Sequence, residues 1–132
     1  MIYLLDTHTF LWAAISPSRL SEKAGSIISD RTQEVQISAV SFWEIALKYA
    51  LGKLELKGVQ PEQMPDVAVD LGLSICLLEP SDAASVYLLP RRAHKDPFDR
   101  MLVWQCIRQH RALLSTDHDL KQYEASGLQI VW

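Results

Sequence analysis

Short apolar runs alternate along the chain with longer segments of helical periodicity, and this alternation restricts the possible folds more than any other feature. The runs predict strands at residues 2–5, 34–38, 73–78, 112–115 and 128–132. Between them, helices are predicted at residues 10–15, 20–29, 41–49, 64–71, 80–89 and 97–110, with a last short helix starting near residue 116. The pattern favours an α/β fold with a single central, mainly parallel sheet of about five strands. Because parallel crossovers are right-handed, helices are expected on both faces of the sheet.

Length and charge set further bounds. A chain of 132 residues predicts a single domain, residues 1–132. The net charge of −3 gives no global nucleic-acid footprint, so any contact with RNA or DNA must be local or carried by a metal ion. Cys76 and Cys106 lie in apolar contexts without metal-type spacing, which predicts buried free thiols in a reducing compartment. No signal-peptide pattern and no membrane-length apolar run are present, so we expect a cytoplasmic protein without a membrane contact.

The strongest local signal is the dipeptide Asp96-Pro97, which predicts a helix with an aspartate N-cap and proline at its first position. Phe98 and Leu102 then recur at the spacing of one buried helical face. Asp99 follows Asp96 by three residues, so both carboxylates lie at the same helix end. An acid there can serve simply to complement the helix dipole.

Acidic residues also follow the predicted strands. Asp6 ends the first strand, Glu44 lies in the first turns of the helix after the second strand, and Asp117 follows the fourth. Asp99 joins the same edge only if the segment 94–97 returns to it. Each acid except Asp6 has an obvious structural alternative: Glu44 can form a capping box with Ser41, and Asp117 or Asp119 can cap the last helix.

Carboxylates gathered at one sheet edge repel one another and are costly without a cation. Oxygen-only ligands favour Mg²⁺ or Mn²⁺. Such an ion activates water and stabilises the leaving oxygen in a displacement at phosphorus. From the residues alone, the acids therefore suggest metal-dependent phosphodiester chemistry, with helix capping as the competing interpretation.

Four stretches of the sequence resemble the successive motifs of PIN domains. They are Leu4–His8, Ser41–Lys48, His94–Leu102 and Leu114–Asp117. Together they resemble the VapC toxins of bacterial type II toxin–antitoxin systems, and the match covers essentially the whole chain.

The resemblance implies a PIN-like fold and an Mg²⁺-dependent endoribonuclease, with Mn²⁺ as a possible substitute. The catalytic and metal-binding acids that it implies are Asp6, Glu44, Asp99 and Asp117. Asp119 is an alternative for the fourth acid, and Asp96 is then a helix cap. The resemblance also implies an RNA substrate, a homodimer, and a VapB-like antitoxin through which any DNA contact is made.

Other polar residues near these motifs have more than one interpretation. Thr7 can orient Asp6 or a phosphate, or cap a helix, and His8 can face the site or solvent. Arg100 can pair with an acid or contact a phosphate. The cluster Arg91, Arg92 and Lys95 can guide an RNA backbone or be merely solvated. For the tryptophans within helical patterns, core or partner contacts are preferred to base stacking: Trp12, Trp43 and Trp104.

Three rival functions remain to be weighed. A haloacid-dehalogenase-like phosphatase also begins with a strand ending in Asp, but it needs a second Asp at the position that His8 occupies. A PIN-like module that binds protein or RNA without cutting is a second rival, and a metal-dependent DNA nuclease is a third.

Overall fold

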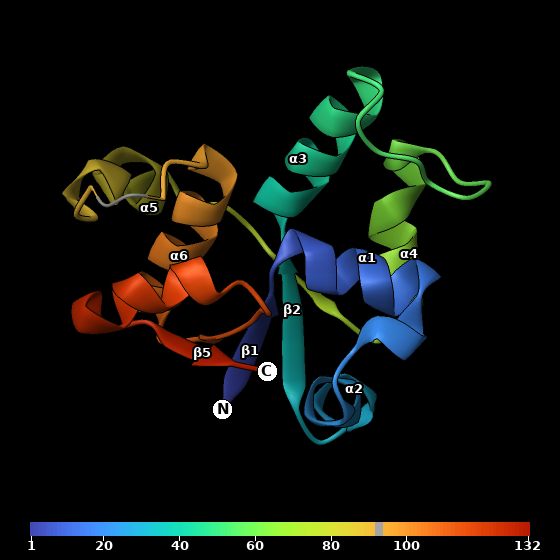
Figure 1. Ribbon diagram of the computed structural model, residues 1–132, viewed down its shortest axis with the longest axis horizontal. Helices are drawn as coiled ribbons and strands as arrows, with labels where there is room; N and C mark the ends of the chain where they lie inside the picture. The colour runs from blue at the N-terminus through green and yellow to red at the C-terminus, as the bar shows by residue number, and fades with distance from the viewer. Residues whose placement is uncertain (92–93) are drawn as a thin grey trace.

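The computed structural model describes residues 1–91 and 94–132, in which a five-stranded sheet lies between two layers of helices (Figure 1). The strands are β1 (Ile2–Leu5), β2 (Glu34–Ser38), β3 (Ser74–Cys76), β4 (Ala112–Leu114) and β5 (Gln129–Val131). Their order is β3-β2-β1-β4-β5, and all four pairings are parallel. The predicted α/β fold class, with one parallel sheet covered on both faces, is confirmed.

The α-helices are α1 (Thr7–Ile15), α2 (Glu22–Ser29), α3 (Ala39–Ala50), α4 (Met64–Asp70), α5 (Pro80–Ser85) and α6 (Pro97–Gln109). Short 3₁₀ segments are η1 (Pro17–Arg19), η2 (Pro61–Gln63), η3 (Val86–Leu88) and η4 (His118–Ser126). The predicted helix at residues 80–89 is thus divided into α5 and η3, and the last helix is a 3₁₀ segment. Among the described residues, no helix has the length and apolar character needed to cross a bilayer.

The start of α3 differs from the prediction. Ser38, the last residue of β2, is the N-cap, and its hydroxyl accepts a hydrogen bond from the Val40 amide at 3.0 Å. Ser41 therefore lies inside the helix and is fully buried. The predicted capping box between Ser41 and Glu44 is wrong, and the Glu44 carboxylate is left for other partners.

Alternate residues of each central strand enter different apolar layers. Leu4 and Leu113 face the layer that contains Leu102 of α6. Leu5 and Leu114 face the opposite layer, which contains α1 and α3 side chains. This alternation follows from the two-residue period of a strand. The predicted buried free thiols are also present, and Cys76 and Cys106 both lie in the α6 layer.

The register of the sheet places the carboxyl ends of β1, β2 and β4 beside one another. Leu5 of β1 pairs with Ile37 of β2 and with Leu114 of β4. The Asp6 amide continues this contact by donating to the Leu114 carbonyl at 3.1 Å. Helices α1 and α3 start directly after their strands, and α6 also begins near this edge (Figure 1). The fold therefore brings four chain segments to one edge of the sheet.

Candidate metal centre at the carboxyl edge of the sheet

Asp6 lies between β1 and α1 and is held by donors from two elements. Its Oδ1 accepts from the Thr9 amide at 2.8 Å, so Asp6 is the N-cap of α1. This cap explains why α1 begins at Thr7, earlier than predicted. Its Oδ2 accepts a short hydrogen bond from the Ser115 hydroxyl at the end of β4. The side chain is buried, and both of its oxygens have fixed positions.

The two aspartates at the start of α6 have different roles. Asp96 is the N-cap, because its Oδ1 accepts from the Phe98 amide at 2.8 Å and from the Asp99 amide at 3.2 Å. The predicted cap is thus present. The Asp99 carboxylate is directed elsewhere, and its Oδ2 lies 3.0 Å from Nε2 of His94.

Asp117 and Asp119 follow β4. Asp117 caps η4, because its Oδ1 accepts from the Asp119 amide at 2.9 Å. The Asp117 amide in turn donates to the Ser115 hydroxyl at 3.0 Å. Ser115 therefore links the backbone of Asp117 to the carboxylate of Asp6. Of the two acids, Asp117 provides the cap and Asp119 lies in the first turn of η4.

Glu44 is buried on α3 and is bound by donors of the protein itself. Its Oε1 accepts from the Thr7 hydroxyl at 2.6 Å, and its Oε2 forms an ion pair with Lys48, one helical turn away. The Thr7 hydroxyl also lies 2.9 Å from the Ser41 hydroxyl. Thr7 therefore orients Glu44, not Asp6 as the sequence suggested. The contact with Glu44 raises the pKa of Lys48, although burial of the amine acts in the opposite direction.

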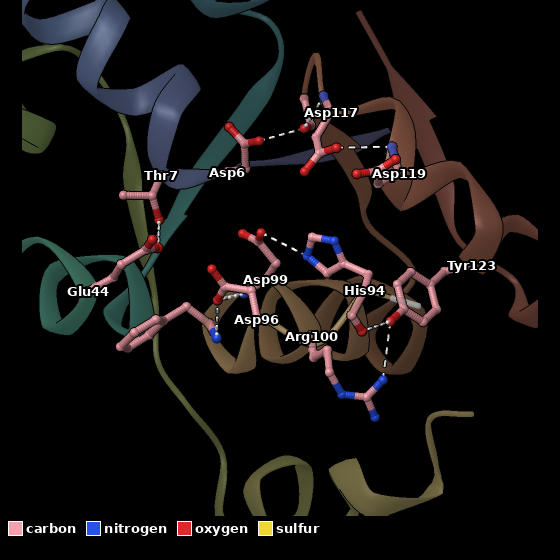
Figure 2. Close-up of polar contacts among 12 residues, drawn as sticks. Asp6, Thr7, Glu44, His94, Asp96, Asp99, Arg100, Asp117, Asp119 and Tyr123 are labelled. Carbon is pink, nitrogen blue, oxygen red and sulfur yellow. Dashed lines mark hydrogen bonds and ion pairs between the residues drawn. The ribbon is translucent and has the colours of Figure 1, made fainter. Parts of the chain in front are cut away.

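A cavity of about 460 Å³ joins most of these acids. Figure 2 shows the side chains of Asp6, Asp99 and Asp117 around one space, with Glu44 to one side against Thr7. The other residues that line the cavity are His8, Trp12, Thr116, His118 and Asp119. Three of the four predicted acids thus share one cavity. Glu44 lies in an adjoining pocket that also contains Thr7, His8 and Lys48.

The electrostatics of this cavity favour a bound cation. Burial raises the pKa of Asp6 above its usual value, against the effect of the hydrogen bonds from Ser115 and Thr9. Burial and the nearby Asp96 and Glu44 carboxylates raise the pKa of Asp99 to about 6. Within the described part of the chain, no lysine or arginine forms an ion pair with either acid or with Asp117.

The donor set fits a hard divalent cation. Three residues, His94, Asp99 and Asp117, each offer one ligand atom, and these three atoms lie within 4.8 Å of one another. Asp6 lines the same cavity and contributes to the raised pKa of Asp99. Carboxylate oxygens are the usual ligands of Mg²⁺ and Mn²⁺, and a bound cation offsets the cost of burying the charged Asp6 and Asp99 and the repulsion of Asp99 by its neighbouring acids.

Sequence reasoning missed His94 as a site residue and misjudged Arg100. The Arg100 guanidinium turns away from the acids and donates to the Leu89 and Pro90 carbonyls at 2.9 and 3.1 Å. It also donates to the Tyr123 hydroxyl at 3.1 Å. The pair with an acid that was suggested for Arg100 is therefore wrong, and its contact with a phosphate stays a prediction. The place of His94 in the same motif as Asp99 was the one available signal for its role.

The described members of the predicted basic cluster, Arg91 and Lys95, do not line the acidic cavity. Arg91 and Lys95 line a different pocket of about 430 Å³ together with Trp43 and Tyr87, and Arg92 lies outside the described residues. Two other lysines, Lys23 and Lys121, lie next to the acidic cavity, and the sequence did not single them out. They line a pocket of about 600 Å³ that shares Asp117 and its two neighbours with the acidic cavity.

Together, the parallel sheet and the carboxylates at its edge define an α/β protein with a candidate divalent-metal centre. Residues 3–126 match the model of the PIN domain family, and the chain belongs to that family. The family predicted from the four motifs is thereby confirmed. Among curated proteins, none has a sequence that matches this chain.

Solved structures with the same fold cover nearly the whole chain. The crystal structure of VapBC2 from Rickettsia felis, bound to a DNA fragment from its promoter, has a TM-score of 0.73 at 16% identity and covers 99% of this chain and 98% of its own. DNA-bound VapBC from Salmonella typhimurium has a TM-score of 0.66 at 16% identity, with 99% and 97% covered. VapBC-1 from nontypeable Haemophilus influenzae has a TM-score of 0.56 at 17% identity, with the same coverage. At these identities the likeness establishes the fold.

Proposed function

We propose that this protein is a metal-dependent endoribonuclease and the toxic component of a type II toxin–antitoxin system. The observation that carries the proposal is the cavity lined by Asp6, Asp99 and Asp117, in which burial and neighbouring acids raise the pKa of Asp99 to about 6. Membership of the PIN family and the likeness to VapBC structures support the same conclusion.

Asp6, Asp99 and Asp117 are the residues that would hold Mg²⁺, or Mn²⁺ in its place. When bound, the ion supplies an activated water for attack on an RNA phosphodiester and stabilises the leaving oxygen. Ser115 and the Thr9 amide fix the Asp6 carboxylate in place. Glu44, the fourth proposed catalytic acid, acts from beside this group, where Thr7 and Lys48 hold it. Asp119 remains the alternative to Asp117.

A path for the RNA backbone leads away from the acids. Lys23 and Lys121 line the pocket next to the acidic cavity, and the two pockets share Asp117. Because the whole chain has a net charge of −3, these cations provide a local attraction that the protein as a whole lacks. Phosphates placed there would lead the strand to the metal centre.

The proposed protein partners are a VapB-like antitoxin and a second copy of the chain, in the cytoplasm. An apolar surface suits such a partner: Trp43 and Tyr87 line one pocket and are 63% and 77% exposed. Exposed aromatic side chains of this kind are enriched at protein interfaces. Trp43 is therefore not a core residue, and we propose that it contacts a partner. Any DNA contact would belong to the antitoxin.

Cleavage of total bacterial RNA by the purified, antitoxin-free protein tests the proposal. We expect discrete cuts with Mg²⁺, none with EDTA, and none with Asp6→Ala or Asp99→Ala. Asp70→Ala, which removes an exposed carboxylate at the end of α4, is the matched control and should cut like the unmodified protein.

The rival functions predict other results. Metal-dependent cutting of DNA with RNA left intact would establish the DNA nuclease. A folded protein that cuts nothing and binds no Mn²⁺ would be a binding module. Membership of the PIN family leaves the phosphatase hypothesis without support.

A further inference from the structure

We propose that His94 provides a nitrogen ligand to the metal centre, and that this ligand makes the centre prefer first-row transition ions such as Mn²⁺ over Mg²⁺. The proposal rests on the metal centre assigned under the proposed function. It goes beyond that function by adding a ligand of a different chemical class and by naming the ion that the ligand favours.

The first observation is the distance between His94 and Asp99. Nε2 of His94 lies 3.0 Å from Oδ2 of Asp99. Two neighbouring ligands of an octahedral ion with bonds of about 2.1 Å lie about 3 Å apart. The two atoms therefore already have the separation that a shared ion requires.

The second observation concerns Asp117. Its carboxylate belongs to the same group, because one of its oxygens lies within 4.8 Å of a ligand atom of His94 and of a ligand atom of Asp99. A histidine that only oriented Asp99 would need no proximity to Asp117. The imidazole thus lies near two acids from different elements, α6 and the start of η4, and can ligate the ion that both would hold.

The third observation is the anchoring of His94 through its backbone. The Tyr123 hydroxyl donates to the His94 carbonyl at 3.2 Å, and Arg100 donates to that hydroxyl at 3.1 Å. Tyr123 is fully buried, and Arg100 also binds the Leu89 carbonyl at the end of η3. These contacts fix the segment before α6, so that the His94 side chain, 13% exposed, is held against Asp99 (Figure 2).

The chemistry of imidazole explains the expected preference. Mg²⁺ binds oxygen ligands almost exclusively, whereas transition ions accept imidazole nitrogen readily. A His94 nitrogen in place of one oxygen ligand therefore lowers the affinity of the centre for Mg²⁺ relative to its affinity for Mn²⁺. An acid-only centre would show no such discrimination from this source.

Electron spin echo spectroscopy of the Mn²⁺-loaded, full-length protein tests this proposal independently of cleavage. We expect a nitrogen coupling to Mn²⁺ in the unmodified protein, a coupling that changes frequency when histidine is labelled with ¹⁵N. It should disappear in His94→Gln. The variants His8→Gln and His118→Gln are matched controls, because both histidines line the cavity, and their coupling should persist.

Calorimetric titration with each ion gives the second readout. We expect His94→Gln to lower Mn²⁺ affinity by about tenfold or more and Mg²⁺ affinity by less. Bound Mn²⁺ without nitrogen coupling in the unmodified protein would overturn this proposal and leave the nuclease intact. If His94→Gln does not fold, persistence of the coupling in both His8→Gln and His118→Gln still excludes these two histidines as its source, and loss of the coupling in either variant would overturn the proposal. A protein that binds no Mn²⁺ at all would overturn both proposals, and nitrogen-coupled Mn²⁺ without RNA cleavage would overturn only the proposed function.

Discussion

The carboxylates on the two sides of Asp6 differ in the groups that balance their negative charge. On the α3 side, Glu44 is buried but receives the Thr7 hydroxyl and the Lys48 ammonium. On the α6 side, Asp99 and Asp117 line an open cavity, and the described residues provide no lysine or arginine to pair with them. Among residues 1–91 and 94–132, His94 is the single side chain that contacts the Asp99 carboxylate.

This difference indicates where an external cation belongs. A buried carboxylate is tolerated when donors within the protein balance its charge, and it is costly when they do not. Glu44 already has that balance. The raised pKa of Asp99 shows that its own surroundings disfavour the charged form, as expected for a ligand that awaits a cation. The variants that follow test this contrast between the balanced side, which contains Glu44, and the unbalanced side, which contains Asp99 and Asp117.

The largest effect is expected within the unbalanced side, between the two aspartates of α6. Asp99→Asn should lower kcat/KM for RNA cleavage by on the order of a thousandfold or more, because it removes a metal-binding charge. Asp96→Asn is the matched change, and asparagine caps helices as well as aspartate does. It should retain cleavage within about threefold. An equal loss in both variants, measured on a fluorogenic RNA, would show that Asp96 is also a ligand.

A smaller effect is expected on the balanced side. Glu44→Gln should lower kcat/KM by about 10- to 100-fold, the range for residues that act beside a metal ion. Its Mn²⁺ affinity, measured by titration calorimetry, should change less than that of Asp99→Asn. Lys48→Met is the control for the other half of the ion pair. Loss of Mn²⁺ binding in Glu44→Gln as complete as in Asp99→Asn would remove the distinction between the two sides.

The sequence predicted the fold where the signals are local. The strands at residues 2–5 and 34–38 have the predicted bounds, because each is a short run that ends at a polar residue. The start of α6 was equally predictable from Asp96 and Pro97. The start of α3 was not, since Ser38 and Ser41 are both suitable caps and the end of β2 decides between them.

The candidate site divides in the same way. The motifs identified the acids, and the positions after the strands explain why they gather at one edge. Their partners depend on contacts between distant segments: Thr7 and Glu44 are 37 residues apart, and Arg100 binds Tyr123 across 23. No local pattern could show that Arg100 anchors backbone carbonyls or that Asp117 lies near His94 and Asp99. These roles became visible only when the fold placed the segments together.

A third prediction separates Asp117 from Asp119. Asp117→Asn should lower kcat/KM by about tenfold, because its carboxylate belongs to the group with His94 and Asp99. Asn at this position still caps η4, so the fold should be retained. Asp119→Asn is the neighbouring control and should stay within about twofold. Thermal unfolding of both variants checks that the comparison concerns the metal centre, and the reverse order of activities would make Asp119 the fourth acid.

The smallest effect is on stability, and it tests the unbalanced side without any RNA. The pKa of Asp99 rises from its usual 3.8 to about 6 in the folded protein, so the folded state holds a proton that the unfolded state has released. The contribution of Asp99 to the free energy of unfolding is therefore fully present below about pH 4 and is lost as the pH rises through about 6. In EDTA, Asp99→Asn should gain about 2 kcal/mol relative to the unmodified protein between pH 4.5 and 7.5, in urea unfolding. Adding Mn²⁺ at pH 7.5 should reverse the order, because the ion binds the charged Asp99 of the folded state and stabilises it. A difference that does not change with pH would mean that His94 already balances Asp99, and the contrast between the two sides of Asp6 would then fail.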